Sequence, residues 1–134
     1  MSKTAEPLDE VFAALMKLLQ KHARGLDALD SLPGSTAKTV KPGCYLYGRI
    51  EVAAFGRKPQ RMYVAGIMRH PKSVAFYSMP LYSHPADCPI SPALEKLRSG
   101  KSCLQITSTA PDLLKELDSH LKQGIAVYKR VGWV

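Results

Sequence analysis

The most constraining feature of this sequence is its centre, where three segments rich in β-forming residues follow one another closely. They lie at 44–55, 62–68 and 73–79, and glycine- and proline-containing stretches of only a few residues separate them. Antiparallel strands can be joined by such short turns, whereas parallel strands need a crossover of a dozen or more residues. The sequence therefore predicts an antiparallel meander. Residues 50–55 either extend the first strand or form a short strand of their own.

A helical pattern precedes the meander. Its apolar residues recur at spacings of three and four, which places them on one helix face: Leu8, Val11, Phe12, Leu15, Leu18, Leu19, Ala23 and Leu26. Pro7 suits the first turn. The helix either ends near Gly25 or continues to Leu29. Residues 31–36 contain several helix breakers and are predicted to form a loop.

A second long helix is predicted at the end of the chain. Thr109 and Asp112 resemble a capping box, and Gly132 is a typical helix stop. The apolar stripe consists of Leu113, Leu114, Leu117, Leu121, Ile125 and Tyr128.

The segment before that helix contains two shorter predicted elements. Residues 80–89 look irregular, Ser91 and Pro92 open a short helix, and Gly100 ends it. Residues 102–107 alternate between polar and apolar side chains, which indicates a half-buried strand.

These elements together predict a single α+β domain over residues 1–134, with residues 1–6 disordered. An antiparallel sheet of about four to five strands would carry the N- and C-terminal helices on one face, with one short helix besides. That arrangement buries both apolar stripes.

Charge and composition narrow the classes of function. The net charge is +8, and the first 30 residues carry four basic and five acidic side chains, so the excess positive charge lies in residues 31–134. Such a charge favours anionic partners, including nucleic acid. No stretch reaches the roughly 20 apolar residues that span a bilayer, so no membrane partner is expected. Three cysteines argue against a disulfide framework, and we expect a cytoplasmic protein that is a monomer or a homodimer.

Basic and aromatic residues are interleaved along the predicted strands. Basic groups neutralise phosphates, and exposed aromatic rings on a sheet can stack on bases. The predicted ligand-binding residues are Tyr45, Tyr47, Arg49, Arg57, Lys58, Arg61, Tyr63 and Tyr77. The alternative is that the strand tyrosines pack against the helices.

A metal site is a second hypothesis. His84, Asp87 and Cys88 offer nitrogen, oxygen and sulfur ligands that suit zinc or iron, but no paired spacing supplies a fourth ligand. No cofactor is predicted otherwise. His120 is expected to be solvated or half-buried beside Glu116, and His22 to lie on a helix face.

Two further signals are weaker. The sequence Ser99-Gly100-Lys101-Ser102 resembles part of a phosphate-binding loop, but it follows a helix and precedes a strand, the reverse of what that loop requires. A nucleophilic cysteine would need a histidine beside Cys44, Cys88 or Cys103, and no catalytic residue is predicted from their spacing.

Three segments of the chain resemble a known family. They are "MPLY" at 79–82, "ISPALEKLRSGKSC" at 90–103 and "YKRVGW" at 128–133. Across residues 8–134 the chain resembles the YdhG-like family, domain of unknown function 1801. The resemblance implies a small α+β sandwich similar to frataxins, and an iron-chaperone role has been attached to part of the family.

The sequence thus leads to three hypotheses about function. The first is a non-enzymatic binding domain for an anionic or small-molecule ligand. The alternatives are an intracellular iron or metal chaperone of the frataxin kind and a nucleic-acid-associated protein.

Overall fold

The central segments pair as the sequence predicts. The computed structural model describes residues 7–29, 43–53, 56 and 58–134. In it, three neighbouring strands form an antiparallel meander. They are β2 (Gly43–Val52), β3 (Gln60–Arg69) and β4 (Val74–Ser78). Residues 50–52 extend the first strand rather than forming a separate one.

Two more strands complete the sheet, so the α+β class is confirmed. β5 (Cys103–Ile106) pairs with β4, and β1 (Asp27–Leu29) pairs with β2, which gives the order β1-β2-β3-β4-β5 with every pair antiparallel. Residues 97–99 cover the outer edge of β5, where the Gln105 N–H donates to the Leu97 carbonyl at 2.8 Å. This contact protects an edge that would otherwise expose unpaired backbone groups.

The option of a first helix reaching Leu29 is wrong. α1 (Leu8–Lys21) ends before Gly25, whose φ of +80° turns the chain out of the helical path. The chain then enters β1 instead. The predicted disordered N-terminus and the predicted loop at 31–36 lie outside the described residues.

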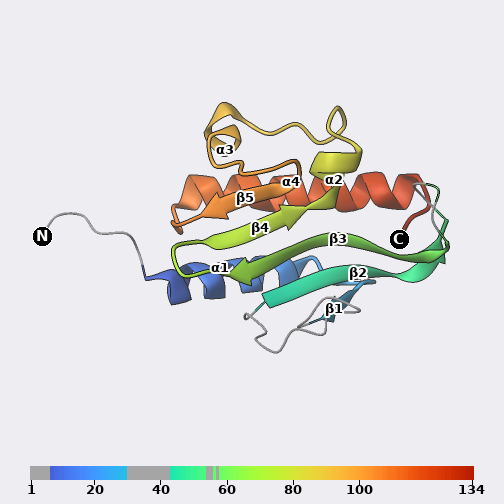
Figure 1. Cartoon of the computed structure of the whole chain (residues 1–134), viewed down its shortest axis with the longest axis horizontal. Coiled ribbons are helices and arrows are strands. Elements are labelled where there is room, and N and C mark those ends of the chain that lie inside the picture. The colour runs from blue at the N-terminus through green and yellow to red at the C-terminus, as the bar shows by residue number, and fades with distance from the viewer. Residues whose placement is uncertain (1–6, 30–42, 54–55, 57) are drawn as a thin grey trace, which may run out of the picture.

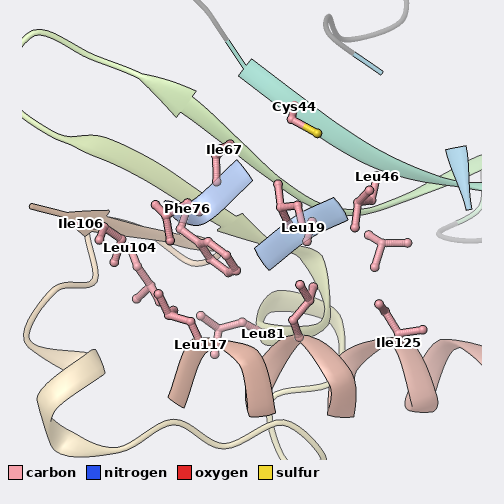
Figure 2. Packing of buried hydrophobic residues seen from close by; sticks show 14 of the residues in the cluster. Leu19, Cys44, Leu46, Ile67, Phe76, Leu81, Leu104, Ile106, Leu117 and Ile125 are labelled. Carbon is pink, nitrogen blue, oxygen red and sulfur yellow. The ribbon is translucent and has the colours of Figure 1, made fainter. Parts of the chain in front are cut away.

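Both long helices cover the same face of the sheet, as Figure 1 shows. α4 (Pro111–Arg130) lies behind β4 and β5, and α1 lies behind β2 and β3. Their apolar stripes meet the strand residues of that face in one core. Figure 2 shows part of it, with Leu19 from α1, Leu117 and Ile125 from α4, and Ile67 and Phe76 from the sheet.

The ends of α4 confirm one prediction and correct another. Gly132 has φ +80°, and the Trp133 N–H donates to the Tyr128 carbonyl at 2.8 Å, a typical helix termination. At the start, however, Ala110 occupies the cap position and no side chain caps the helix. Pro111 at the first turn has no N–H to satisfy, which reduces the need for a capping side chain.

The segment predicted to be irregular contains a short helix, α2 (Met79–Ser83), so that prediction is corrected. The Ser78 hydroxyl accepts from the Leu81 N–H at 3.3 Å, and Pro80 fits the first turn. Pro80 also packs against Gly124 of α4, where an added Cβ would lie 2.7 Å from its Cγ. The predicted helix at Ser91 is present as α3 (Pro92–Glu95), with Ser91 as its cap, but it ends at Glu95 and not at Gly100 as predicted.

None of the helices in the described ranges is long and apolar enough to cross a membrane. The three cysteines are free thiols.

Candidate ligand-binding face

Strand register places the four predicted tyrosines on the sheet face opposite the helices. Tyr45, Gly66 and Tyr77 are register partners across three strands, and Tyr47 pairs with Tyr63. Register partners point to the same side of a sheet. Their sequence neighbours, such as Cys44 and Phe76, point into the core. The tyrosines therefore gather on what we call the tyrosine face.

The rings on this face contact one another. Tyr47 and Tyr63 are stacked with their centroids 5.1 Å apart, and Tyr45 meets Tyr63 edge-on at 6.2 Å. Tyr45 is buried, whereas the other three are half-buried. The tyrosines thus divide between packing and exposure: Tyr45 fills space on the sheet, and Tyr47 and Tyr63 line a cavity described below.

Gly66 makes this packing feasible. A Cβ at this position would lie 2.5 Å from the Tyr63 hydroxyl oxygen and 2.6 Å from a ring carbon of Tyr45. Both side chains therefore pack directly against the backbone of Gly66. The Tyr63 hydroxyl lies there without a hydrogen-bond partner, one of two such buried side-chain groups in the described part of the chain. Burial raises the pKa of Tyr63 well above its usual value, because the phenolate would be desolvated.

An arginine network borders the tyrosine face. Asp27 of β1 accepts from the Arg49 Nε at 2.9 Å and from Arg61, whose own Nε donates to the Gly48 carbonyl at 2.7 Å. The hydrogen bond from Arg49 and the nearby charge of Arg61 lower the pKa of Asp27. Arg61 also lies 6.0 Å from the centre of the Tyr47 ring, at the limit of a cation–π contact.

A cavity of about 400 Å³ opens beside these groups. Tyr47, Tyr63 and Arg61 form one side of it, and Met79 and Tyr82 of α2 form another. Tyr82 is 47% exposed, and the Lys101 ammonium lies 5.9 Å from its ring centre. The volume of the cavity falls in the range of small-molecule sites. A ligand there would meet aromatic surfaces and positive charge together.

The local charge of this region is positive. Arg49, Arg61 and Lys101 supply three cationic groups, while Asp27 and Glu51, which faces Arg61 in register, supply two carboxylates. One positive charge therefore remains. Lys58 is exposed, and Arg57 lies outside the described residues. Arg69, another strand arginine, bonds to Asp9 on the helix-covered side and does not belong to this face.

Tyr82 of the cavity wall and two charged residues near the cavity, Lys101 and Asp27, are not among the residues predicted from the sequence. Tyr82 lies in the segment predicted to be irregular, and Lys101 lies in a turn between α3 and β5. Asp27 lies in β1, in a segment that the sequence pattern allowed to be part of the first helix. Only the pairing of β1 with β2 and the position of α2 beyond the end of β4 bring them to the tyrosine face.

The three residues of the metal hypothesis do not converge. The His84 ring packs edge-on against Tyr128 and Trp133, with centroids 5.7 and 5.2 Å away. Asp87 forms an ion pair with Arg130 at 3.5 Å, and Cys88 is buried. Among the described residues, no group of three or more histidine, cysteine, aspartate or glutamate side chains is arranged to hold a metal ion.

The cysteines show no sign of activation. Burial raises the pKa of Cys44 and of Cys88, which disfavours the thiolate. Cys103 is half-buried and accepts from the Gln105 amide at 3.5 Å. No structural feature therefore marks one of these thiols as a nucleophile.

The expectation that His120 is solvated or half-buried is wrong. It is 5% exposed, because α4 turns this side toward the sheet and its Nε2 lies 2.7 Å from the Ser78 hydroxyl. His22 does not lie on a helix face as expected but directly follows the last residue of α1, and its Nε2 is 2.6 Å from Asp118 of α4.

Two segments quoted for the family resemblance meet in space. The Ser83 hydroxyl, just after the "MPLY" segment, lies 2.7 Å from the Tyr128 hydroxyl of the tail, and Trp133 packs on Tyr128 with centroids 5.0 Å apart. The resemblance itself stays a prediction. Scans for this chain find no matching family model, no matching curated protein and no matching solved structure.

Proposed function

We propose that this protein is a binding domain whose tyrosine face takes a small ligand that carries an aromatic ring and a negative charge. The observation that carries the proposal is the cavity whose walls combine two stacked tyrosines with the Arg61 guanidinium. Ring surfaces favour a flat ligand, and the excess of positive charge favours an anion.

The exposed wall of the cavity is its most adaptable part. Tyr82 contacts only the Lys101 ammonium among the ring interactions of the described residues, so a planar ligand can stack on it with little loss of packing. The opposite wall is held in place by the hydrogen bonds of Arg61 to Gly48 and Asp27. A ligand would therefore enter between a fixed wall and an exposed ring.

Adenosine monophosphate, adenosine and inorganic phosphate are suitable probes, since they separate the contributions of ring and charge. Titrations of the full chain followed by two-dimensional NMR should show adenosine monophosphate binding more tightly than either of the other two. The shifted amides should belong to residues 47, 60–63 and 79–82. Equal affinities for adenosine and adenosine monophosphate would contradict the proposal that the site favours a negatively charged ligand.

Two variants test Tyr82 of the cavity wall and Lys101 beside it. Tyr82→Ala should weaken the binding of adenosine monophosphate by roughly 5- to 150-fold, because stacking of a base on an aromatic side chain contributes about 1–3 kcal/mol. Lys101→Glu should weaken it about fivefold and leave adenosine unchanged. Lys122→Glu is the matched control, because it makes the same charge change on α4 and leaves the cavity untouched. Equal effects of Lys101→Glu and Lys122→Glu would show that only net charge matters.

The two alternatives from the sequence stay predictions. Tighter binding of a single-stranded oligonucleotide than of the mononucleotide, with a steep salt dependence, would favour the nucleic-acid hypothesis. Heat released on titration with iron(II) or zinc at concentrations near that of the protein would favour the metal-chaperone hypothesis.

A further inference from the structure

A second cavity lies on the helix side of the molecule, between α4 and residues 87–94. It has a volume of about 430 Å³, and we call it the histidine groove. Its apolar wall includes Ile90 and Leu94, and its polar wall includes Glu116, His120 and Gln123 of α4. The groove and the tyrosine-face cavity share no lining residue.

His120 is the unusual member of this wall. The side chain is buried, its Nε2 pairs with the Ser78 hydroxyl, and its Nδ1 has no hydrogen-bond partner. A buried polar atom without a partner costs free energy and calls for an explanation. His120 lines the groove, but Nδ1 itself has almost no accessible surface, so a ligand in the groove becomes its partner only if the groove wall opens slightly around the ring.

The hydrogen bonds of Ser78 determine which ring nitrogen carries the proton. Its oxygen already accepts from the Leu81 N–H, and its single hydroxyl hydrogen is satisfied only if it is donated to the His120 Nε2. Desolvation on burial lowers the pKa of His120, so the ring is neutral and has one N–H. That proton therefore belongs to Nδ1, which is a donor.

Glu116 supplies an acceptor one helical turn away. Residues at i and i+4 lie on the same side of a helix, and both of these line the groove. Glu116 Oε2 accepts from the Ser91 N–H at 3.1 Å. A carboxylate has about four acceptor positions, so Glu116 can also accept from a ligand.

We propose that the histidine groove binds a neutral ligand with a primary carboxamide and an apolar body. The ligand carbonyl accepts from the His120 Nδ1–H, and its NH₂ group donates to Glu116. The apolar body lies against Ile90 and Leu94. A carboxylate in the same place would be repelled by Glu116, and an ammonium would leave the His120 donor without an acceptor.

Cys88 also lines the groove, but as part of its wall. It is 1% exposed, and burial raises the pKa of its thiol. The Ser78 hydroxyl is likewise buried and caps α2. The groove is therefore proposed as a binding site without a covalent step.

Three probes with the same ring test the proposal on the full chain: benzamide, benzoate and benzylammonium. Two-dimensional NMR should show benzamide shifting the amides of residues 87–94 and 116–123, with an affinity about tenfold higher than the other two, the equivalent of one net hydrogen bond. Equal affinities of the three probes, or shifts confined to other residues, would overturn the proposal.

The variant Glu116→Gln changes the acceptor and keeps His120 in place. It should lower the preference for benzamide over benzoate about tenfold, because the carboxylate's charge and its extra acceptor positions are both lost. Glu10→Gln makes the same change on the exposed first turn of α1 and should leave the preference unaltered. An unaltered preference in Glu116→Gln would contradict the assigned role of the carboxylate.

The proton position can be measured without any ligand. Long-range proton–nitrogen NMR of the histidine rings should place the His120 proton on Nδ1. A proton on Nε2 would make Nδ1 an acceptor and would overturn the proposed carboxamide recognition.

Discussion

The cavity beside the tyrosine face and the histidine groove are similar in size but differ in the chemistry of their walls. The first lies mainly on β2 and β3, its walls are aromatic and cationic, and its buried unpartnered group is a phenol hydroxyl over Gly66. The second lies between α4 and the segment before α3, and it carries the carboxylate of Glu116. The difference shows that a strongly basic chain can still offer a locally acidic site, because a cavity's charge depends on the few groups that line it.

The largest effect is expected at Gly66 of the tyrosine face, compared with Gly124, the glycine of α4 that contacts Pro80. Gly66→Ala would drive a methyl group into Tyr63 and Tyr45, and we expect a loss of about 1–3 kcal/mol in the free energy of unfolding, measured with urea. In Gly124→Ala the added methyl group would contact only the Pro80 side chain. Alanine's better helix propensity would offset about 1 kcal/mol of the cost of that contact, so we expect a smaller loss of stability. A larger loss for Gly124→Ala would reverse this ranking.

Alkaline pH should destabilise the protein because Tyr63 of the tyrosine face and Tyr128 of α4 have raised pKa values in the folded state. Burial raises the pKa of Tyr128 to about 12, whereas an unfolded tyrosine titrates near 10. The unfolded state then releases protons that the folded state retains, so stability is full below about pH 10 and falls toward pH 12. The expected slope is up to roughly 1.4 kcal/mol per pH unit for each such tyrosine, and Tyr128→Phe should reduce it.

The two buried hydroxyls should respond in opposite directions to removal. Tyr63→Phe deletes an unpartnered hydroxyl and should raise the free energy of unfolding by about 1 kcal/mol. Tyr128→Phe deletes the hydroxyl that lies 2.7 Å from Ser83 and should lower it by about 1 kcal/mol. Thermal and urea unfolding at neutral pH measure both. Destabilisation by Tyr63→Phe would mean that its hydroxyl has a partner in solution.

The smallest effect is expected at the surface network. Asp27→Asn removes the negative charge that Arg49 and Arg61 share, and exposed ion pairs of this kind contribute little to stability because water and salt screen them. Stability should therefore change little. Affinity for adenosine monophosphate should rise, because one carboxylate near the cavity is lost. Weaker binding in this variant would show that Asp27 is needed to position Arg61.

Sequence reasoning found much of the tyrosine face and almost none of the histidine groove. Tyr47, Arg61 and Tyr63 lie on strands, where a period of two in sequence corresponds directly to one face of the sheet. The groove combines residues 87–94 with one side of α4, and no period relates these two segments. His120 interrupts an apolar stripe, and its burial follows only from the contact with Ser78.

Local patterns alone determined the α+β class, the antiparallel meander, the two amphipathic helices and the helix end at Gly132, because these depend on neighbouring residues and backbone preferences. Tertiary structure decided that residues 27–29 become an edge strand, that Met79–Ser83 forms a helix against Gly124, and that His120 is buried beside a groove. Each of these outcomes depends on contacts between segments far apart in the chain, and burial, hydrogen-bond partners and cavity walls exist only once those segments are packed together.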